Sequence, residues 1–95
     1  MGKYHVHRND ANTDAIVEAL EAVGATVTRL GNPLDLLVGR RGTNYLLEVK
    51  TASGKLRASQ KRFLSLWRGQ AAVVRSADEA LHAIGADAHR EDARS

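Results

Sequence analysis

Apolar residues follow two spacings along this chain, one typical of helices and one typical of strands. Ile16 and Leu20 are four residues apart, as on one side of a helix, and Asn12 or Thr13 can cap the N-terminus of that helix. Gly24 is a typical residue for its end. The same reasoning predicts helices at about residues 13–23, 59–68 and 76–84, and strands at 26–30, 34–38, 45–50 and 71–75. The order α-β-β-β-α-β-α predicts one α/β domain whose mixed sheet is flanked by helices.

Three charged residues interrupt two strands that are otherwise apolar: Asp35 in the first, and Glu48 and Lys50 in the second. Ionised groups in such surroundings need a partner or a metal, because desolvation costs several kcal/mol per ion. Glu48 and Lys50 share one face, since side chains alternate along a strand. A tight turn centred on Arg41 and Gly42 places Asp35 directly across from Glu48, with β-carbons about 4.5–5.5 Å apart. A bulge or an asymmetric loop would break this register.

Two carboxylates that face each other repel unless a cation lies between them. An all-oxygen site of this kind suits Mg²⁺ or Mn²⁺ rather than zinc. For Glu48 and Lys50 taken alone, a charged edge strand or a local ion pair is an equally good interpretation. The strand register therefore predicts a divalent-ion site at Asp35 and Glu48, with Lys50 one pleat away.

The composition indicates a single small globular domain. The chain has 95 residues, of which 43% are hydrophobic and 26% charged, and it contains no cysteine. The lack of cysteine excludes a disulfide framework and thiolate zinc sites, and it fits an intracellular protein. No apolar run reaches the length of a membrane span and no signal peptide is recognised, so we expect no membrane partner.

Basic residues are concentrated in one segment, although the net charge is only +3. Between residues 49 and 77 there is no acid, and the seven basic residues are Lys50, Lys55, Arg57, Lys61, Arg62, Arg68 and Arg75. Such a segment suits a polyanion such as nucleic acid, although a solvated charged face explains it as well when it is taken alone. Arg40 and Arg41 at the hairpin tip likewise either contact a phosphate backbone or form a solvated turn.

The ordered motifs resemble those of the PD-(D/E)XK nuclease superfamily, and most closely the small stand-alone VRR-NUC (virus-type replication-repair nuclease) proteins of phages. The resemblance covers residues from about 10 to 85, and it rests on the segments 31–39, 46–50, 60–63, 67–69 and 73–76. It implies a restriction-endonuclease-like αβββαβ core and a location in a bacterial cytoplasm, phage-encoded or bacterial.

The same resemblance implies roles for individual residues. Asp35 and Glu48 would bind Mg²⁺ with help from the backbone carbonyl of Val49. Lys50 would position the attacking water or stabilise charge on the phosphate, and Gln60 would support the site. These roles agree with the chemistry of phosphodiester hydrolysis, which uses a metal and a nearby cation.

The chain departs from the family pattern in two places. The usual Pro-Asp pair is extended to Pro33-Leu34-Asp35, which either shifts the strand register by one residue or reshapes the turn. The first-helix glutamate of the family has no counterpart, which leaves Asp14 or Glu18 as candidate metal ligands or as ordinary exposed helix acids.

We therefore expect a Mg²⁺-dependent, structure-specific DNA endonuclease, and the resemblance implies branched DNA such as four-way (Holliday) junctions as its substrate. Cutting both strands needs two active sites, which a homodimer supplies. The alternative is a catalytically inactive nucleic-acid-binding module with the nuclease fold. Lys55, Arg57, Lys61 and Arg62 are the expected phosphate contacts, and no aromatic stacking platform is expected.

The remaining expectations concern the domain limits and the aromatic residues. We expect an N-terminal segment at residues 1–9, a nuclease domain at 10–85 and a flexible tail at 86–95. Phe63 and Trp67 lie at helical spacing and are expected in the core, although Trp67 could also form a subunit contact. His5 and His7 have the spacing of a metal pair, but a loose terminus is the simpler interpretation.

Overall fold

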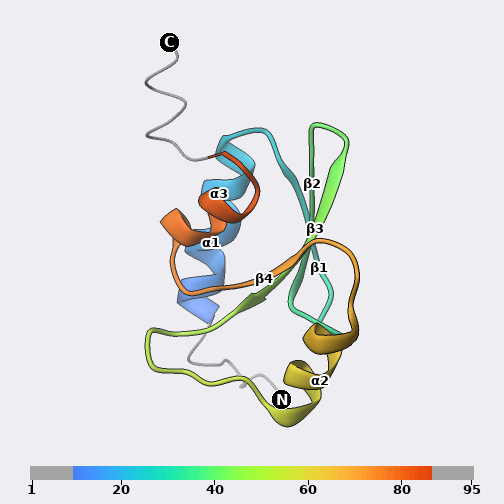
Figure 1. Cartoon of the computed structure of the whole chain (residues 1–95). Helices are drawn as coiled ribbons and strands as arrows, with labels where there is room; N and C mark the ends of the chain where they lie inside the picture. The colour runs from blue at the N-terminus through green and yellow to red at the C-terminus, as the bar shows by residue number, and fades with distance from the viewer. Residues whose placement is uncertain (1–9, 87–95) are drawn as a thin grey trace.

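The computed structural model describes residues 10–86, so the predictions for residues 1–9 and 87–95 lie outside the described part. The element order agrees with the predicted one. The elements are α1 (Asp10–Ala22), β1 (Thr26–Arg29), β2 (Leu36–Arg40), β3 (Thr43–Val49), α2 (Ala58–Leu66), β4 (Ala71–Val74) and α3 (Ala77–Ala83). This is a small α/β fold with a four-stranded mixed sheet flanked by helices, as the sequence predicted, and it is compatible with an αβββαβ core (Figure 1).

The sheet has the strand order β1-β2-β3-β4, with β1, β2 and β3 antiparallel and β4 parallel to β3. The predicted hairpin register is confirmed, since Leu36 pairs with Leu47 and Arg40 pairs with Thr43. The two turn residues Arg41 and Gly42 have φ values of 53° and 79°. Positive φ at both central residues is the geometry of the two-residue turn that suits the twist of a hairpin.

The helices divide between the two faces of the sheet. Helices α1 and α3 lie side by side on one face, and α2 lies on the other (Figure 1). Alternate residues of β2 and β3 point toward α1 and α3, so Leu36, Val38 and Leu47 are buried there. They join a core that contains Ile16 and Leu20 of α1. The residues of opposite parity face the side of α2.

The ends of α1 and α3 refine two predictions. Helix α1 begins at Asp10, so Asn12 lies inside the helix and does not cap it. Helix α3 is capped as predicted, because Ser76 accepts a hydrogen bond from the backbone N–H of Glu79 at 3.1 Å. Ala86 is fully buried, so the packed core extends one residue beyond the predicted limit. The prediction that this residue begins a flexible tail is therefore wrong.

Helix α2 departs most from expectation. It ends at Leu66, and its only buried residue is Gln60. Trp67 is 43% exposed and Phe63 is half-buried, so the prediction that both belong to the core is wrong. Helical spacing identifies which residues share one side of a helix, but it does not show whether another element covers that side. None of the helices in the described part is long and apolar enough to cross a membrane.

Candidate functional site

The hairpin register brings Asp35 and Glu48 together. Asp35 immediately precedes β2, and extending the Leu36–Leu47 pairing by one residue places it opposite Glu48. Its carboxylate oxygen Oδ2 accepts a hydrogen bond from the backbone N–H of Val49 at 2.8 Å. The Asp35 side chain thus accepts the backbone hydrogen bond that would otherwise continue the pairing of β2 and β3. The Pro33-Leu34-Asp35 segment therefore does not shift the strand register.

Glu48 is the most buried charged residue described, with 2% of its surface exposed. Its Oε2 atom accepts a hydrogen bond from Gln60 Nε2 at 2.6 Å and lies 3.2 Å from the ammonium of Lys50. The other carboxylate oxygen, Oε1, is buried with no hydrogen-bond partner. Buried polar atoms are nearly always satisfied in folded proteins, so this oxygen lacks a partner that such an atom ordinarily has.

The surroundings of the Glu48 carboxylate also disfavour its negative charge. Burial raises the pKa of the Glu48 carboxyl above its ordinary value of 4.5, and the negative charge of Asp35 raises it further. The contacts with Lys50 and Gln60 act in the opposite direction, but they do not cancel the rise in pKa. A cation bound between the two acids would relieve both the desolvation and the repulsion.

The donor set fits Mg²⁺ or Mn²⁺. Both acids offer carboxylate oxygens, and the backbone carbonyl of Val49 points to the same strand edge as its N–H, which contacts Asp35. Magnesium is commonly held by one or two carboxylates, with water and substrate phosphate filling the other positions. Among the described residues, no group of three or more His, Cys, Asp or Glu side chains is placed to hold a metal.

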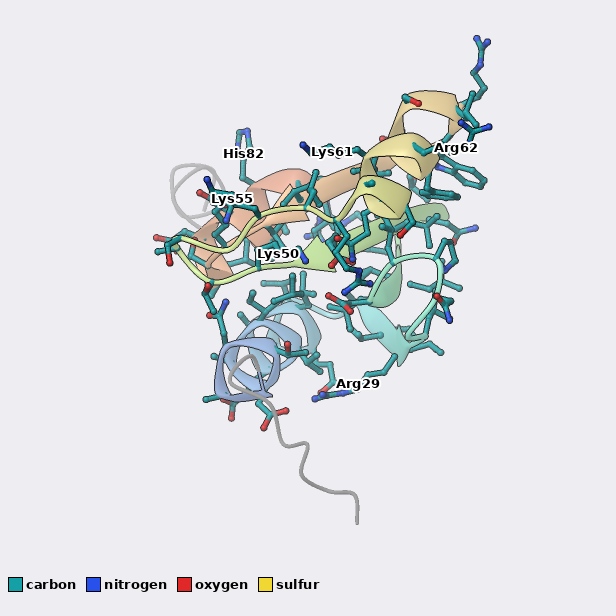
Figure 2. All side chains as sticks on the ribbon, turned by 90° about the horizontal axis from the view of Figure 1, so that it is seen from below. Arg29, Lys50, Lys55, Lys61, Arg62 and His82 are labelled. Atoms are coloured by element: carbon teal, nitrogen blue, oxygen red, sulfur yellow. The ribbon has the colours of Figure 1, made fainter. Side chains whose placement is uncertain are left out.

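Neither Asp14 nor Glu18 adds a third carboxylate to this pair. Asp14 and Glu18 are both exposed on α1. Asp14 Oδ1 forms an ion pair with Arg29 at 2.8 Å on the surface. The side chain of Arg29 projects beside α1, on the opposite side of the molecule from α2 (Figure 2). The structure therefore shows these acids as surface residues.

Two residues that the sequence did not single out for the site hold the backbone just after Lys50. The Asn12 side-chain amide donates to the carbonyl of Lys50 at 3.1 Å and to that of Arg75 at 3.4 Å. The guanidinium of Arg75 donates to the carbonyls of Thr51 and Gly54 at 2.7 and 2.6 Å. These bonds tie the end of β3 and the following loop to α1 and β4. The partners are 21 to 63 residues apart, so no local pattern could reveal them.

Gln60 lies at the first turn of α2, on the site face of the sheet. Besides donating to Glu48, it accepts a hydrogen bond through Oε1 from the backbone N–H of Arg57 at 2.9 Å. The amide group is therefore held from both sides. Its orientation leaves Glu48 Oε2 occupied and Oε1 unpaired.

The predicted phosphate contacts separate into two groups. Arg41, Lys55, Arg57, Lys61 and Arg62 are exposed. In Figure 2, Lys55, Lys61 and Arg62 project outward, whereas Lys50 lies near the centre of the molecule between α1 and α2. Arg40 is different, because it is only 8% exposed and its Nε donates to the carbonyl of Val23 at 3.5 Å. Its side chain lies on the α1 face of β2, so Arg40 is a structural residue and not an exposed phosphate contact.

Comparisons of the chain with protein-family models, curated proteins and solved structures found no match. The chemistry of the site therefore rests on its own geometry. Two opposed carboxylates and one buried ammonium form a site suited to a divalent cation and an anionic ligand.

Proposed function

We propose that this protein is a Mg²⁺-dependent DNA endonuclease that hydrolyses phosphodiester bonds, with Mn²⁺ able to replace Mg²⁺. The observation that carries the proposal is the buried, unpaired Glu48 Oε1 opposite Asp35, with the Lys50 ammonium 3.2 Å from Oε2 of the same carboxylate. A protein that only needed a stable strand would gain by replacing these charges with apolar side chains. The arrangement is costly for folding and suits catalysis.

The contacts of the residues support a role for each in this reaction. Asp35, Glu48 and the Val49 carbonyl would hold the metal, which when bound polarises the phosphoryl oxygen and lowers the pKa of the attacking water. Lys50 would orient that water or stabilise the charge that develops on the phosphate. Gln60 fixes the Glu48 carboxylate through its 2.6 Å hydrogen bond.

The surface charge supports a nucleic-acid substrate. Exposed lysine and arginine side chains in the loop after Lys50 and along α2 lie next to the site in the chain, and this segment has no acidic residue. Such cations contact phosphates and provide affinity without reading sequence. Branched DNA such as a four-way junction is the substrate we infer. A homodimer in a bacterial cytoplasm, phage-encoded or bacterial, would supply the two active sites that such a junction requires.

The direct test is cleavage of a labelled four-way junction in Mg²⁺, in Mn²⁺ and in EDTA. We expect cleavage by the wild type in both metals, and a loss of about a hundredfold or more in Glu48→Ala and in Lys50→Ala. Glu21→Gln is the matched control, because Glu21 is an exposed acid of α1 that is not assigned to the site. Cleavage that survives Glu48→Ala would indicate a contaminating nuclease and would remove the assignment.

A second candidate function is a nucleic-acid-binding module without catalysis. The observation that favours it is that the described side chains include no group of three or more His, Cys, Asp or Glu placed to hold a metal. This candidate predicts tight binding of the junction with no cleavage in either metal. The same assay therefore separates the two functions.

A further inference from the structure

The side chain of Trp67 is exposed and yet held in one position. The ring stacks on Phe63, with centroids 5.3 Å apart and an angle of 25° between the planes. Its Nε1 donates to the carbonyl of Gln70 at 3.3 Å, and the backbone N–H of Leu46 donates to the same carbonyl at 3.1 Å. The indole is thereby tied to β3, the strand that carries Glu48.

Glycine at position 69 is needed for this arrangement. A β-carbon there would come within 2.9 Å of the indole Nε1, closer than real contacts allow. The chain therefore passes tightly under one part of the ring while 43% of Trp67 stays open to solvent. Fixed aromatic rings bind other rings well, because little conformational entropy is lost on binding.

An open cavity of about 520 Å³ lies beside this ring. Leu37 and Leu46 pair across β2 and β3 within it, and the amide side chains of Asn44 and Gln70 belong to its polar part. Leu46 precedes Glu48 by two residues on the same face, so the cavity begins about 7 Å along the strand from the acid pair. The cavity and the candidate metal site thus lie on the same face of the sheet.

The charges around the cavity are complementary to a nucleotide. None of its lining residues is charged. Arg41 and Arg68 are exposed and adjoin lining residues in the chain, Arg41 beside Gly42 and Arg68 beside Trp67. Apolar walls, an aromatic face and amide groups suit a base, and flanking arginines suit its phosphates.

We propose that this cavity binds an unpaired nucleobase of the DNA, stacked on Trp67, next to the phosphodiester bond to be cut. The inference rests on the proposed function and specifies its substrate class: DNA with an unpaired nucleotide beside the cleavage site. Fully paired DNA keeps its bases in the stack and leaves the cavity empty. Trp67 is then a specificity residue for branched or partly single-stranded DNA.

A second copy of the chain fits the cavity less well. A two-fold axis through it would set the same hollow opposite itself and leave a void. Of the large apolar side chains exposed in the described part, only Leu37 and Trp67 line the cavity, which is a small apolar area for the centre of a dimer interface.

Tryptophan fluorescence provides a test that does not depend on catalysis, since Trp67 is the only tryptophan in the chain. The wild type is titrated in EDTA with oligothymidylate and, separately, with a fully paired duplex of the same length. We expect the oligothymidylate to quench the fluorescence strongly and the duplex to leave it almost unchanged. By anisotropy of a labelled oligothymidylate, Trp67→Ala should weaken binding about five- to a hundredfold.

Two variants control for damage to the fold. Trp67→Phe keeps an aromatic face and should recover most of the affinity. Leu66→Ala removes the most exposed large apolar side chain, which is outside the cavity lining, and should leave the affinity unchanged. Duplex binding should be equal in all four proteins.

The possible results separate this inference from the proposed function. Quenching without any junction cleavage would overturn the endonuclease and support the base site. Cleavage with no quenching, or an equal loss of oligothymidylate and duplex binding in Trp67→Ala, would overturn the base site. A change in Trp67 emission with protein concentration in the absence of DNA would show that a second copy covers the ring, which would also overturn it.

Discussion

The buried carboxylate of Glu48 should lower the stability of the metal-free protein, and a substitution that removes its charge tests this. Replacing it through Glu48→Gln keeps the shape of the side chain and removes the charge. The substitution removes the desolvation cost and the repulsion from Asp35, which raise the pKa, together with the attraction to Lys50, which lowers it. Because the net effect is a raised pKa, we expect the metal-free variant to be more stable than the wild type at neutral pH.

The sign and scale follow from proton linkage. A carboxyl whose pKa is higher in the folded state holds its proton more firmly there than in the unfolded chain. The folded state is therefore most stable when this carboxyl is protonated, and that stability is fully present below the unfolded pKa, near 4.5. That contribution is lost as the pH rises through the folded pKa. Each unit of difference in pKa is worth about 1.4 kcal/mol, and 1 kcal/mol corresponds to about 4–8 °C in Tm for a domain of this size.

Urea unfolding between about pH 4 and about pH 8 in EDTA measures the effect. We expect the free energy of unfolding of Glu48→Gln to exceed that of the wild type at the upper end of this range, and the difference to shrink toward acid pH. The exposed acid Glu21 provides the control Glu21→Gln, which should follow the wild type. Mg²⁺ at tenfold above its Kd should then stabilise the wild type by about 1.4 kcal/mol and the Glu48→Gln variant far less.

One result would refute the reasoning behind this prediction. If the wild type in EDTA at neutral pH is more stable than Glu48→Gln, the attraction to Lys50 outweighs the burial of the carboxylate. Glu48 and Lys50 then form a stabilising ion pair that needs no metal. The argument from the unpaired Oε1 atom would fail with it.

Three further predictions concern the surroundings of the site. Gln60→Ala should lower the free energy of unfolding by about 1–3 kcal/mol, because a buried carboxylate loses a hydrogen bond, and urea titration measures the loss. Leu36→Ala should lower the free energy of unfolding by about 2–5 kcal/mol, since that side chain is fully buried. Leu37→Ala should lower it by less than about 1 kcal/mol, because Leu37 is 39% exposed. Equal losses for the two leucines would contradict the observed strand parity. Arg75→Ala should speed amide hydrogen exchange across residues 51–57, because the guanidinium holds two carbonyls of that loop. Unchanged exchange would mean that the loop is held by other contacts.

The turn and the strand parity explain why the acid pair could be predicted. Arg41 and Gly42 leave two residues between the strands, and a two-residue turn fixes the register of every later pair. Asp35 and Glu48 then face each other whatever the rest of the chain does. The helices around the sheet were predictable for a similar reason, because their spacing and their stop signals are local.

Burial was harder to predict than position. The sequence places Arg40 at a hairpin tip and Trp67 on the apolar side of α2, yet Arg40 is buried and Trp67 is exposed. Whether a side chain meets solvent depends on which element lies over it, and that element is remote in the chain. Arg40 lies under the end of α1, as its bond to Val23 shows, whereas nothing in the described part covers the open face of Trp67.

By itself the sequence determined the order of the elements, the hairpin register and the pairing of two acids with a lysine, because each depends on residues close together in the chain. Only the tertiary structure decided that Glu48 keeps one oxygen unpaired, that Asn12 and Arg75 hold the strand beside it, and that Trp67 lines a cavity on β2 and β3. These features depend on contacts between α1, β3, β4 and the end of α2. Contacts of that kind form only when distant segments pack together, so local sequence patterns do not predict them.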